Sequence, residues 1–137
     1  RRCIATAHAG WRGTAAGIAA RTVEAMVRDY GCQAQNILAA IGPGIGPCCF
    51  EPHADVPDGL RDGLGEEAGA YIRPLSAPGK FSVDLKGANA RFLQRAGVMP
   101  EHISLCPACT ACGLDVFWSH RVQGNNRGSM AAVIQLI

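Results

Sequence analysis

The feature that most constrains the fold is a run of glycines and prolines directly after an apolar stretch. Residues 37–41 read Ile-Leu-Ala-Ala-Ile and have the length of a buried strand. Residues 42–47 read Gly-Pro-Gly-Ile-Gly-Pro. This run can form neither a helix nor a strand ladder, because proline lacks a backbone N–H and glycine favours turns. The sequence therefore predicts a buried strand that ends in a shaped loop.

The remainder of the sequence predicts helices and further strands. Thr14 is the expected N-cap of an amphipathic helix that ends near Gly31, and Asp84 is the expected N-cap of a helix that ends at Gly97. A helix weakened by glycines is expected between residues 52 and 70. Extended segments are expected at residues 1–8, 81–83, 103–105, 116–118 and 131–137, the last of them in the core.

Helices and strands in this order predict an α+β fold, a layered α/β sandwich with a mixed sheet. No internal repeat, low-complexity tract or linker divides the 137 residues, so we expect a single domain over residues 1–137. Residue 1 is Arg and the chain opens inside an expected strand. We therefore expect the fold to lack its N-terminal strands.

Charge and composition exclude several classes of function. Thirteen Lys and Arg against eleven Asp and Glu leave a formal charge of +2, too weak a field to attract nucleic acid or an anionic membrane. No apolar stretch approaches the ~20 residues of a membrane-spanning helix. Seven cysteines are too few for a disulfide scaffold, and an odd number leaves at least one thiol free, metal-bound or shared between chains. We expect a cytoplasmic protein.

The segment around His8 offers groups for catalysis or metal binding. His8 ends the first expected strand, and Gly10 and Gly13 beyond it leave room for a ligand near the backbone. A neutral imidazole can ligate a metal or act as a general base, or simply form a hydrogen bond at a strand end. Arg12 can bind phosphate or a carboxylate through two parallel hydrogen bonds, or lie on a surface turn.

The loop of residues 42–47 differs from a dinucleotide-binding turn, because Pro47 stands where the third glycine belongs. Its prolines favour a rigid pocket wall over an anion cradle. The adjacent Cys48 and Cys49 follow this loop and do not bridge one another without strain. They are either two small buried side chains, the commoner arrangement, or include a reactive thiol that faces the site.

A second group of cysteines has the C-x2-C-x2-C spacing that begins an iron–sulfur motif: Cys106, Cys109 and Cys112. The fourth cysteine of that motif is missing, because Val116 occupies its position. Two interpretations of these cysteines remain. They form a zinc site with His102 or His120 as the fourth ligand, or they belong to a cysteine-rich loop without metal. On the expected strand that follows, Ser119 and Arg121 share one face.

Several stretches together resemble the laccase-domain family, known both as polyphenol oxidases and as purine nucleoside phosphorylases. They are residues 7–14, with HAGWRG; residues 41–51, with GPGIGPCCFE; residues 83–85; and residues 109–110 followed by 117–121. They occur in the family's order and extend the resemblance from Ala7 to the last residue. Two motifs of this length in one short chain make the resemblance specific.

The resemblance implies an α/β sandwich enzyme that cleaves adenosine, inosine and methylthioadenosine with phosphate and deaminates adenosine. It also implies a metal, zinc or alternatively copper, held by two histidines and a cysteine. Only one of these ligands has a counterpart, His8, since the other two lie in upstream segments that are absent here; the family cysteine is neither Cys48 nor Cys49. We therefore expect weak metal binding at His8, impaired activity in this chain, and exposed apolar edges that favour aggregation or pairing, for example as a homo-oligomer.

For the longer parent enzyme, the expected substrates are a purine nucleoside and phosphate. The expected catalytic residues are His8, Arg12 and Arg121, with the arginines stabilising phosphate or developing negative charge and His8 also binding the metal. The residues expected to form the substrate pocket are Gly44, Cys48, Cys49 and Ser119. The sequence departs from the family at Val122, where a second arginine is usual, so phosphate contacts are not assigned to residues 124–130.

Two other functions remain open. One is copper-dependent oxidation of phenols, although the four histidines are scattered and a multicopper site needs several together. The other is a non-catalytic zinc-binding or interaction module built on Cys106, Cys109 and Cys112.

Overall fold

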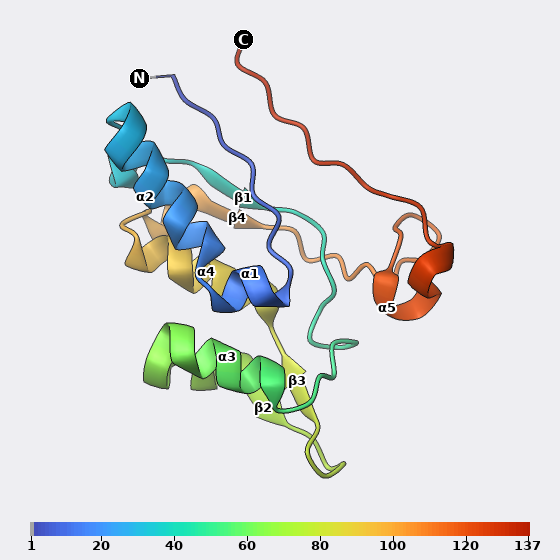
Figure 1. Cartoon of the computed structure of the whole chain (residues 1–137). Coiled ribbons are helices and arrows are strands. Elements are labelled where there is room, and N and C mark those ends of the chain that lie inside the picture. The colour runs from blue at the N-terminus through green and yellow to red at the C-terminus, as the bar shows by residue number, and fades with distance from the viewer. Residues whose placement is uncertain (1) are drawn as a thin grey trace.

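The computed structural model describes residues 2–137 and alternates helices with short strands (Figure 1). The helices are α1 (Trp11–Ala15), α2 (Ile18–Tyr30), α3 (Asp55–Leu64), α4 (Leu85–Arg95) and α5 (His120–Gln123). The strands are β1 (Ala39–Ile41), β2 (Ile72–Pro74), β3 (Phe81–Val83) and β4 (Ile103–Leu105). Short 3-10 helices span Ala34–Asn36, Gly65–Tyr71, Pro100–His102 and Gly124–Asn126.

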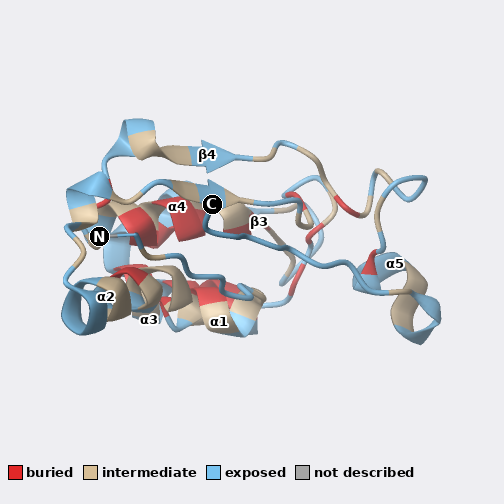
Figure 2. Cartoon of the chain, turned by 90° about the horizontal axis from the view of Figure 1, so that it is seen from above, coloured by how far each residue is buried: buried red, intermediate tan, exposed pale blue. Residues whose placement is uncertain are grey.

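The strands form two pairs of opposite kind. β1 and β4 are parallel, with Ala39 opposite Ile103, whereas β2 and β3 are antiparallel, with Ile72 opposite Val83. Viewed from above, α4 lies between the β1–β4 pair and the layer of α1, α2 and α3 (Figure 2). The expected mixture of helices and strands in a layered single domain is thus confirmed.

Two apolar clusters hold these layers together. The larger cluster joins α3, β3 and α4, where Leu60, Val83 and Ala88 are completely buried. The smaller cluster joins α2 to α4 through Val23 and Leu93, and packs against the inner side chains of β1 and β4. Burial is concentrated between the helices, while α5 and both chain ends are largely exposed (Figure 2).

The capping predictions have opposite outcomes. Asp84 is confirmed as the N-cap of α4, since its carboxylate accepts a hydrogen bond of 3.0 Å from the Gly87 amide. Thr14 as an N-cap is wrong, because Thr14 lies inside α1 and is completely buried. The single helix expected there is divided at Gly17, whose φ of 71° is left-handed and which packs against the ring of Phe92.

The helix expected over residues 52–70 is shorter than predicted. α3 ends at Leu64, where Gly65 has a φ of 65°, and a 3-10 helix continues from there. β2 follows this 3-10 helix and is not among the predicted strands, because three residues that include Pro74 carry no alternating pattern.

The strand predictions at residues 81–83 and 103–105 are confirmed. The strand expected at residues 37–41 is reduced to β1 and is not buried, since Ala40 is exposed and Leu38 is 78% exposed. The described residues contain no third strand that would cover the outer edge of β1.

Three expected strands are wrong: the described part of residues 1–8, residues 116–118 and residues 131–137 form none. Residue 1 itself lies outside the described residues. The C-terminus is not in the core, because Val133 is 89% and Ile137 98% exposed. An extended segment becomes a strand only when a partner satisfies its backbone groups, and none does so here. In the described part of the chain, no helix is both long and apolar enough to cross a membrane.

Candidate functional site

Four cysteines from two distant parts of the sequence converge beyond the ends of β1 and β4: Cys48, Cys49, Cys109 and Cys112. Their Sγ atoms all lie within 4.8 Å of one another. The Sγ atom of Cys112 is 3.6 Å from that of Cys48 and 3.3 Å from that of Cys49. All seven cysteines of the chain are free of disulfides, so this cluster consists of thiols.

The parallel pairing of β1 with β4 explains this convergence. The carboxyl ends of two adjacent parallel strands lie at the same edge of the sheet. Beyond the strands, the Cys106 amide donates to the Ile41 carbonyl over 2.8 Å and the Thr110 amide donates to the Gly44 carbonyl over 3.2 Å. The two loops therefore run together for several residues and end in the turns that carry the cysteines.

Each turn holds its cysteines through backbone hydrogen bonds. The amides of Cys49 and Phe50 both donate to the Gly46 carbonyl at 3.0 Å, and the amide of Cys112 donates to the Cys109 carbonyl at 3.2 Å. A Cβ added at Gly46 would lie 3.2 Å from the Cys48 Sγ and 3.3 Å from the Cys109 Cβ. A side chain at position 46 would therefore require its neighbours in the two loops to shift by a few tenths of an ångström.

Two of these thiols, Cys49 and Cys109, differ strongly in pKa. Burial raises the pKa of the Cys109 thiol, but backbone N–H donors outweigh it and bring this pKa to about 6. The donors belong to Gly46, Cys112 and Ala111. In contrast, a hydrogen bond with Cys112, together with burial, raises the pKa of Cys49 to about 12. Near neutral pH the cluster thus combines a thiolate with protonated thiols.

The cysteine triad predicted from spacing is wrong in its membership. Cys106 is not part of the cluster, because it still lies in the extended stretch beside residue 41, before the turn. Neither His102 nor His120 completes the cluster, since Cys48 and Cys49 supply the remaining sulfur atoms. Lys86 from α4 fixes the loop by donating to the carbonyls of Cys106 and Ala108 over 2.8 and 2.9 Å.

His8 lies in the extended segment just before α1 and is exposed. A Cβ at position 10 would be 3.1 Å from the His8 Nε2, so Gly10 leaves room for the imidazole itself. The Thr14 hydroxyl donates to the Ala9 carbonyl over 3.4 Å and accepts from the Asn89 side-chain amide over 2.8 Å. These bonds connect the turn that follows His8 to the buried face of α4.

The two predicted catalytic arginines are exposed, and each lies over an aromatic ring. The guanidinium of Arg12 is 4.3 Å from the centre of the Trp11 ring, and that of Arg121 is 5.2 Å from the centre of the Phe50 ring. Because Phe50 follows Cys49, the ring contact holds Arg121 beside the cysteine loop. Trp11 packs against the core cluster that contains Phe50, so both arginines adjoin the same apolar core.

The remaining predicted pocket residues have different surroundings. Gly44 forms an isolated parallel bridge with Cys109 and belongs to the loop that carries Cys48 and Cys49. Ser119 is only 3% exposed, and its backbone amide donates to the Gln123 side chain over 2.9 Å. The strand alternation expected for Ser119 and Arg121 is wrong, because α5 begins at His120.

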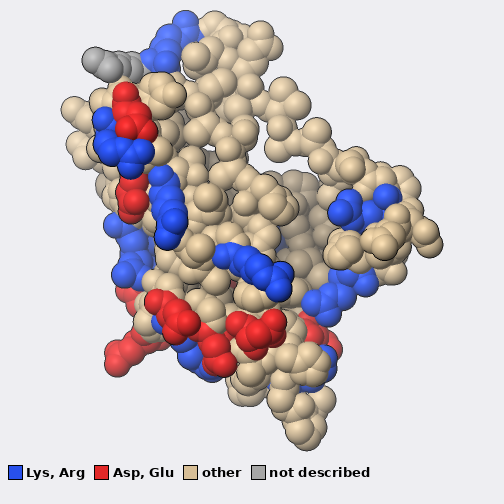
Figure 3. All heavy atoms as spheres, viewed as in Figure 1, with Lys and Arg blue, Asp and Glu red and all other residues tan. Residues whose placement is uncertain are grey.

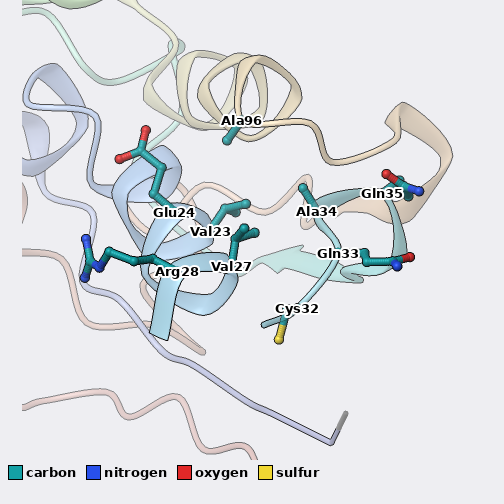
Figure 4. Close-up of a pocket in the computed structure, with 9 residues that line it drawn as sticks. All are labelled: Val23, Glu24, Val27, Arg28, Cys32, Gln33, Ala34, Gln35 and Ala96. Carbon is teal, nitrogen blue, oxygen red and sulfur yellow. The ribbon is translucent and has the colours of Figure 1, made fainter. Parts of the chain in front are cut away.

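Neither the acidic side chains over α3 nor the surface hollow beside α2 coincides with any of the predicted site residues. Asp and Glu side chains gather over α3, and Lys and Arg are spread singly over the face shown (Figure 3). A hollow of about 580 Å³ lies between the end of α2 and the residue after α4 (Figure 4). Val23, Glu24 and Ala96 line it, and none of the predicted site residues does.

Comparison with known sequences assigns this chain to a family. The sequence model described as multi-copper polyphenol oxidoreductase laccase matches residues 1–137. The purine nucleoside phosphorylase YlmD of Geobacillus stearothermophilus is 42% identical over 131 residues, 96% of this chain and 47% of its own length. The adenosine deaminase RL5, from an unknown prokaryotic organism, is 37% identical over 125 residues, 91% of this chain and 47% of its own length.

A solved structure supports the same relationship. The hypothetical protein YfiH of Bacillus licheniformis superposes with a TM-score of 0.80 at 36% sequence identity, over 84% of this chain and 43% of that one. The chain spans about half the length of the relatives named here. The match over its whole length shows that the chain belongs to the multi-copper polyphenol oxidoreductase laccase family.

Proposed function

We propose that this chain forms part of an enzyme that cleaves purine nucleosides with phosphate and also deaminates adenosine. The observation that carries the proposal is the family match over residues 1–137, together with relatives named as a purine nucleoside phosphorylase and an adenosine deaminase. The expected substrates are adenosine, inosine and methylthioadenosine. The whole reaction needs the segments that the relatives possess and this chain does not contain.

The metal centre implied by the resemblance does not fit the residues present. Among residues 2–137, no group of three ligand side chains includes His8, and the single group found consists of cysteines. A catalytic zinc or copper at His8 would take its other ligands from outside this chain. The roles below therefore use only this chain's own side chains.

In phosphorolysis, a phosphate oxygen attacks the anomeric carbon, the bond from that carbon to the base breaks, and the base takes up a proton. Arg12 and Arg121 are suited to bind the phosphate, because each is exposed and neither forms an ion pair within the described residues. Their ring contacts reduce the freedom of the guanidinium groups and leave the N–H edges for an anion. Preorganised cations of this kind stabilise charge as it develops.

His8 is the proposed group for proton transfer. Its imidazole is exposed beside a glycine turn that hydrogen bonds connect to α4. An imidazole at a fixed position can donate a proton to a leaving base or remove one from an attacking water near neutral pH. Gly44 with the loop of Cys48 and Cys49 is the proposed pocket wall, and the buried Ser119 is proposed to support this wall from behind.

The experiment joins this chain to the upstream half of the Geobacillus stearothermophilus relative and supplies adenosine with or without phosphate. Chromatography then detects adenine, hypoxanthine and inosine. His8→Ala should lower turnover about 100-fold or more, the usual loss of a general acid or base. His53→Ala is the matched control, because His53 contacts Lys80 at 3.0 Å on another loop. Full turnover in the His8 variant would contradict the proposal.

Copper-dependent oxidation of phenols is the competing activity, and the family's description is the observation in its favour. Oxygen uptake by the joined protein with a phenol and added copper separates the two. Oxygen uptake without nucleoside cleavage would replace the proposed function.

A further inference from the structure

We propose that Cys48, Cys49, Cys109 and Cys112 form a structural zinc site that fastens the loop after β1 to the loop after β4. The site can be tested separately from the proposed catalytic function, and none of its ligands is His8. Zinc, rather than a hard cation such as calcium or magnesium, is the ion whose chemistry matches four sulfur ligands.

The distances in the cluster match a zinc tetrahedron. Zinc–sulfur bonds of about 2.3 Å in tetrahedral geometry place the sulfur atoms about 3.8 Å apart. The Cys48 and Cys49 sulfur atoms lie 3.6 and 3.3 Å from that of Cys112, and no pair in the cluster exceeds 4.8 Å. Displacements of well under 1 Å for these two pairs would complete the geometry.

The donor set indicates a closed site. Four thiol ligands fill the tetrahedral coordination of zinc and leave no position for water or substrate. The cluster contains no histidine or carboxylate among the described residues. A site of this composition stabilises structure and does not activate a substrate.

The surroundings already favour sulfur in its charged form. The Gly46 amide donates to the Cys109 Sγ over 3.2 Å, the kind of hydrogen bond that supports a metal-bound thiolate. The ammonium group of Lys86 is held at the carbonyls of Cys106 and Ala108, just before Cys109, and partly offsets the two negative charges of a zinc tetrathiolate. Binding releases to solvent the protons of thiols that are still protonated.

The two halves of the site belong to two loops that hydrogen bonds already bring side by side. The Cys109 turn leads to the exposed segment that holds α5 and Arg121. A zinc ion bound by both turns would fix this segment against the loop that carries Phe50, over which Arg121 lies. We therefore expect zinc to order residues 106–121.

The test uses this chain, reduced and freed of metal, and titrates it with Co²⁺ as a spectroscopic substitute for zinc. We expect one Co²⁺ per chain, with an intense thiolate-to-metal charge-transfer band and the visible bands of a tetrahedral ion. Zinc should displace Co²⁺ and abolish these bands. Cys49→Ser and Cys112→Ser should each lower the affinity at least about tenfold, as even second-layer changes around zinc do.

Three controls make the result specific. Cys106→Ser keeps the neighbouring thiols and should leave the spectrum unchanged, because Cys106 lies outside the cluster. His8→Ala should also leave it unchanged, which separates this site from the family's metal centre. Cys112→His should restore binding with a weaker charge-transfer band, and Cys112 is exposed, so its variants should fold.

Three results would overturn the proposal. One is a folded, reduced chain that gives no tetrahedral cobalt spectrum. Another is a spectrum that survives in both Cys49→Ser and Cys112→Ser. The third is zinc-loaded protein in which mass spectrometry finds these cysteines joined in disulfides. Nucleoside turnover is not a readout, so failure of the proposed function leaves the test unaffected.

Discussion

The backbone amide of Gly46 donates a hydrogen bond to the Sγ atom of Cys109, 63 residues away in the sequence, over 3.2 Å. This bond joins the loop after β1 to the loop after β4 at the centre of the cysteine cluster. At this approach of the two loops, a side chain at position 46 would make unusually tight contacts with Cys48 and Cys109.

Gly46→Ala should destabilise the protein by about 1–3 kcal/mol, the usual effect of overpacking. The added methyl group would contact the Cys48 Sγ at 3.2 Å and the Cys109 Cβ at 3.3 Å. Urea unfolding measures the loss. Gly42→Ala is the matched control in the same loop, because a Cβ at position 42 meets nothing within 4 Å. Equal stability of the two variants would contradict the packing described here.

Removal of the buried bond between Asn89 and Thr14 should cost about 1–3 kcal/mol, because it leaves one hydrogen-bonding position of a buried polar group unfilled. Asn89→Ala and Thr14→Val, singly and together, form a double-mutant cycle that urea unfolding measures. We expect the double variant to lose less than the sum of the single losses. Strict additivity would show that the two side chains do not interact.

Acid should weaken the ion pair between Glu67 and Arg91. The Arg91 Nε lies 2.9 Å from Glu67 Oε2, and hydrogen bonding to Arg91 lowers the pKa of Glu67. A carboxyl whose pKa is lower in the folded state stabilises the protein above the unfolded pKa, and this contribution disappears as the pH falls through the folded pKa. The stability gap between wild type and Glu67→Gln should therefore narrow as the pH falls below the ordinary carboxyl range. Chemical unfolding at a series of pH values tests this, and a constant gap would refute it.

Arg121→Ala in the joined protein should raise the KM for phosphate about tenfold or more, because a phosphate contact to a charged donor is lost. Arg121→Lys should recover part of the affinity, since it keeps the charge but not the planar guanidinium. Steady-state kinetics with varied phosphate measures both. Arg28→Ala is the control, because Arg28 pairs with Asp29 at 2.7 Å on α2. An unchanged KM in Arg121→Ala would remove this residue from the phosphate site.

The predictions that succeeded depend on short-range chemistry. Asp84 caps α4 through a residue three positions away, and the glycine–proline run ends β1, so each is determined by its immediate neighbours. The division of the first helix at Gly17, where the backbone is left-handed, was not predicted, because the apolar periodicity continues across this glycine. The family motifs indicated the family to which the chain belongs, but they did not predict any of these contacts.

The cysteine cluster likewise could not be predicted from neighbouring residues alone. The spacing of Cys106, Cys109 and Cys112 indicated a metal site but gave the wrong members, because spacing does not show where an extended stretch ends and a turn begins. The information that was missing is the parallel pairing of β1 with β4. Given that pairing, the loops after two predicted strands meet at one edge, and Cys48 and Cys49 become the natural partners of Cys109.

That pairing also has a consequence for the order of folding. The β2–β3 hairpin and its neighbouring helices connect residues that are close in sequence, whereas Cys49 and Cys112 meet across 63 residues. Closing so long a loop costs chain entropy before any contact is gained, and parallel pairings are correspondingly slow to form. We expect the segment from α3 to α4 to become protected against hydrogen exchange first during refolding, and the two cysteine turns to meet last.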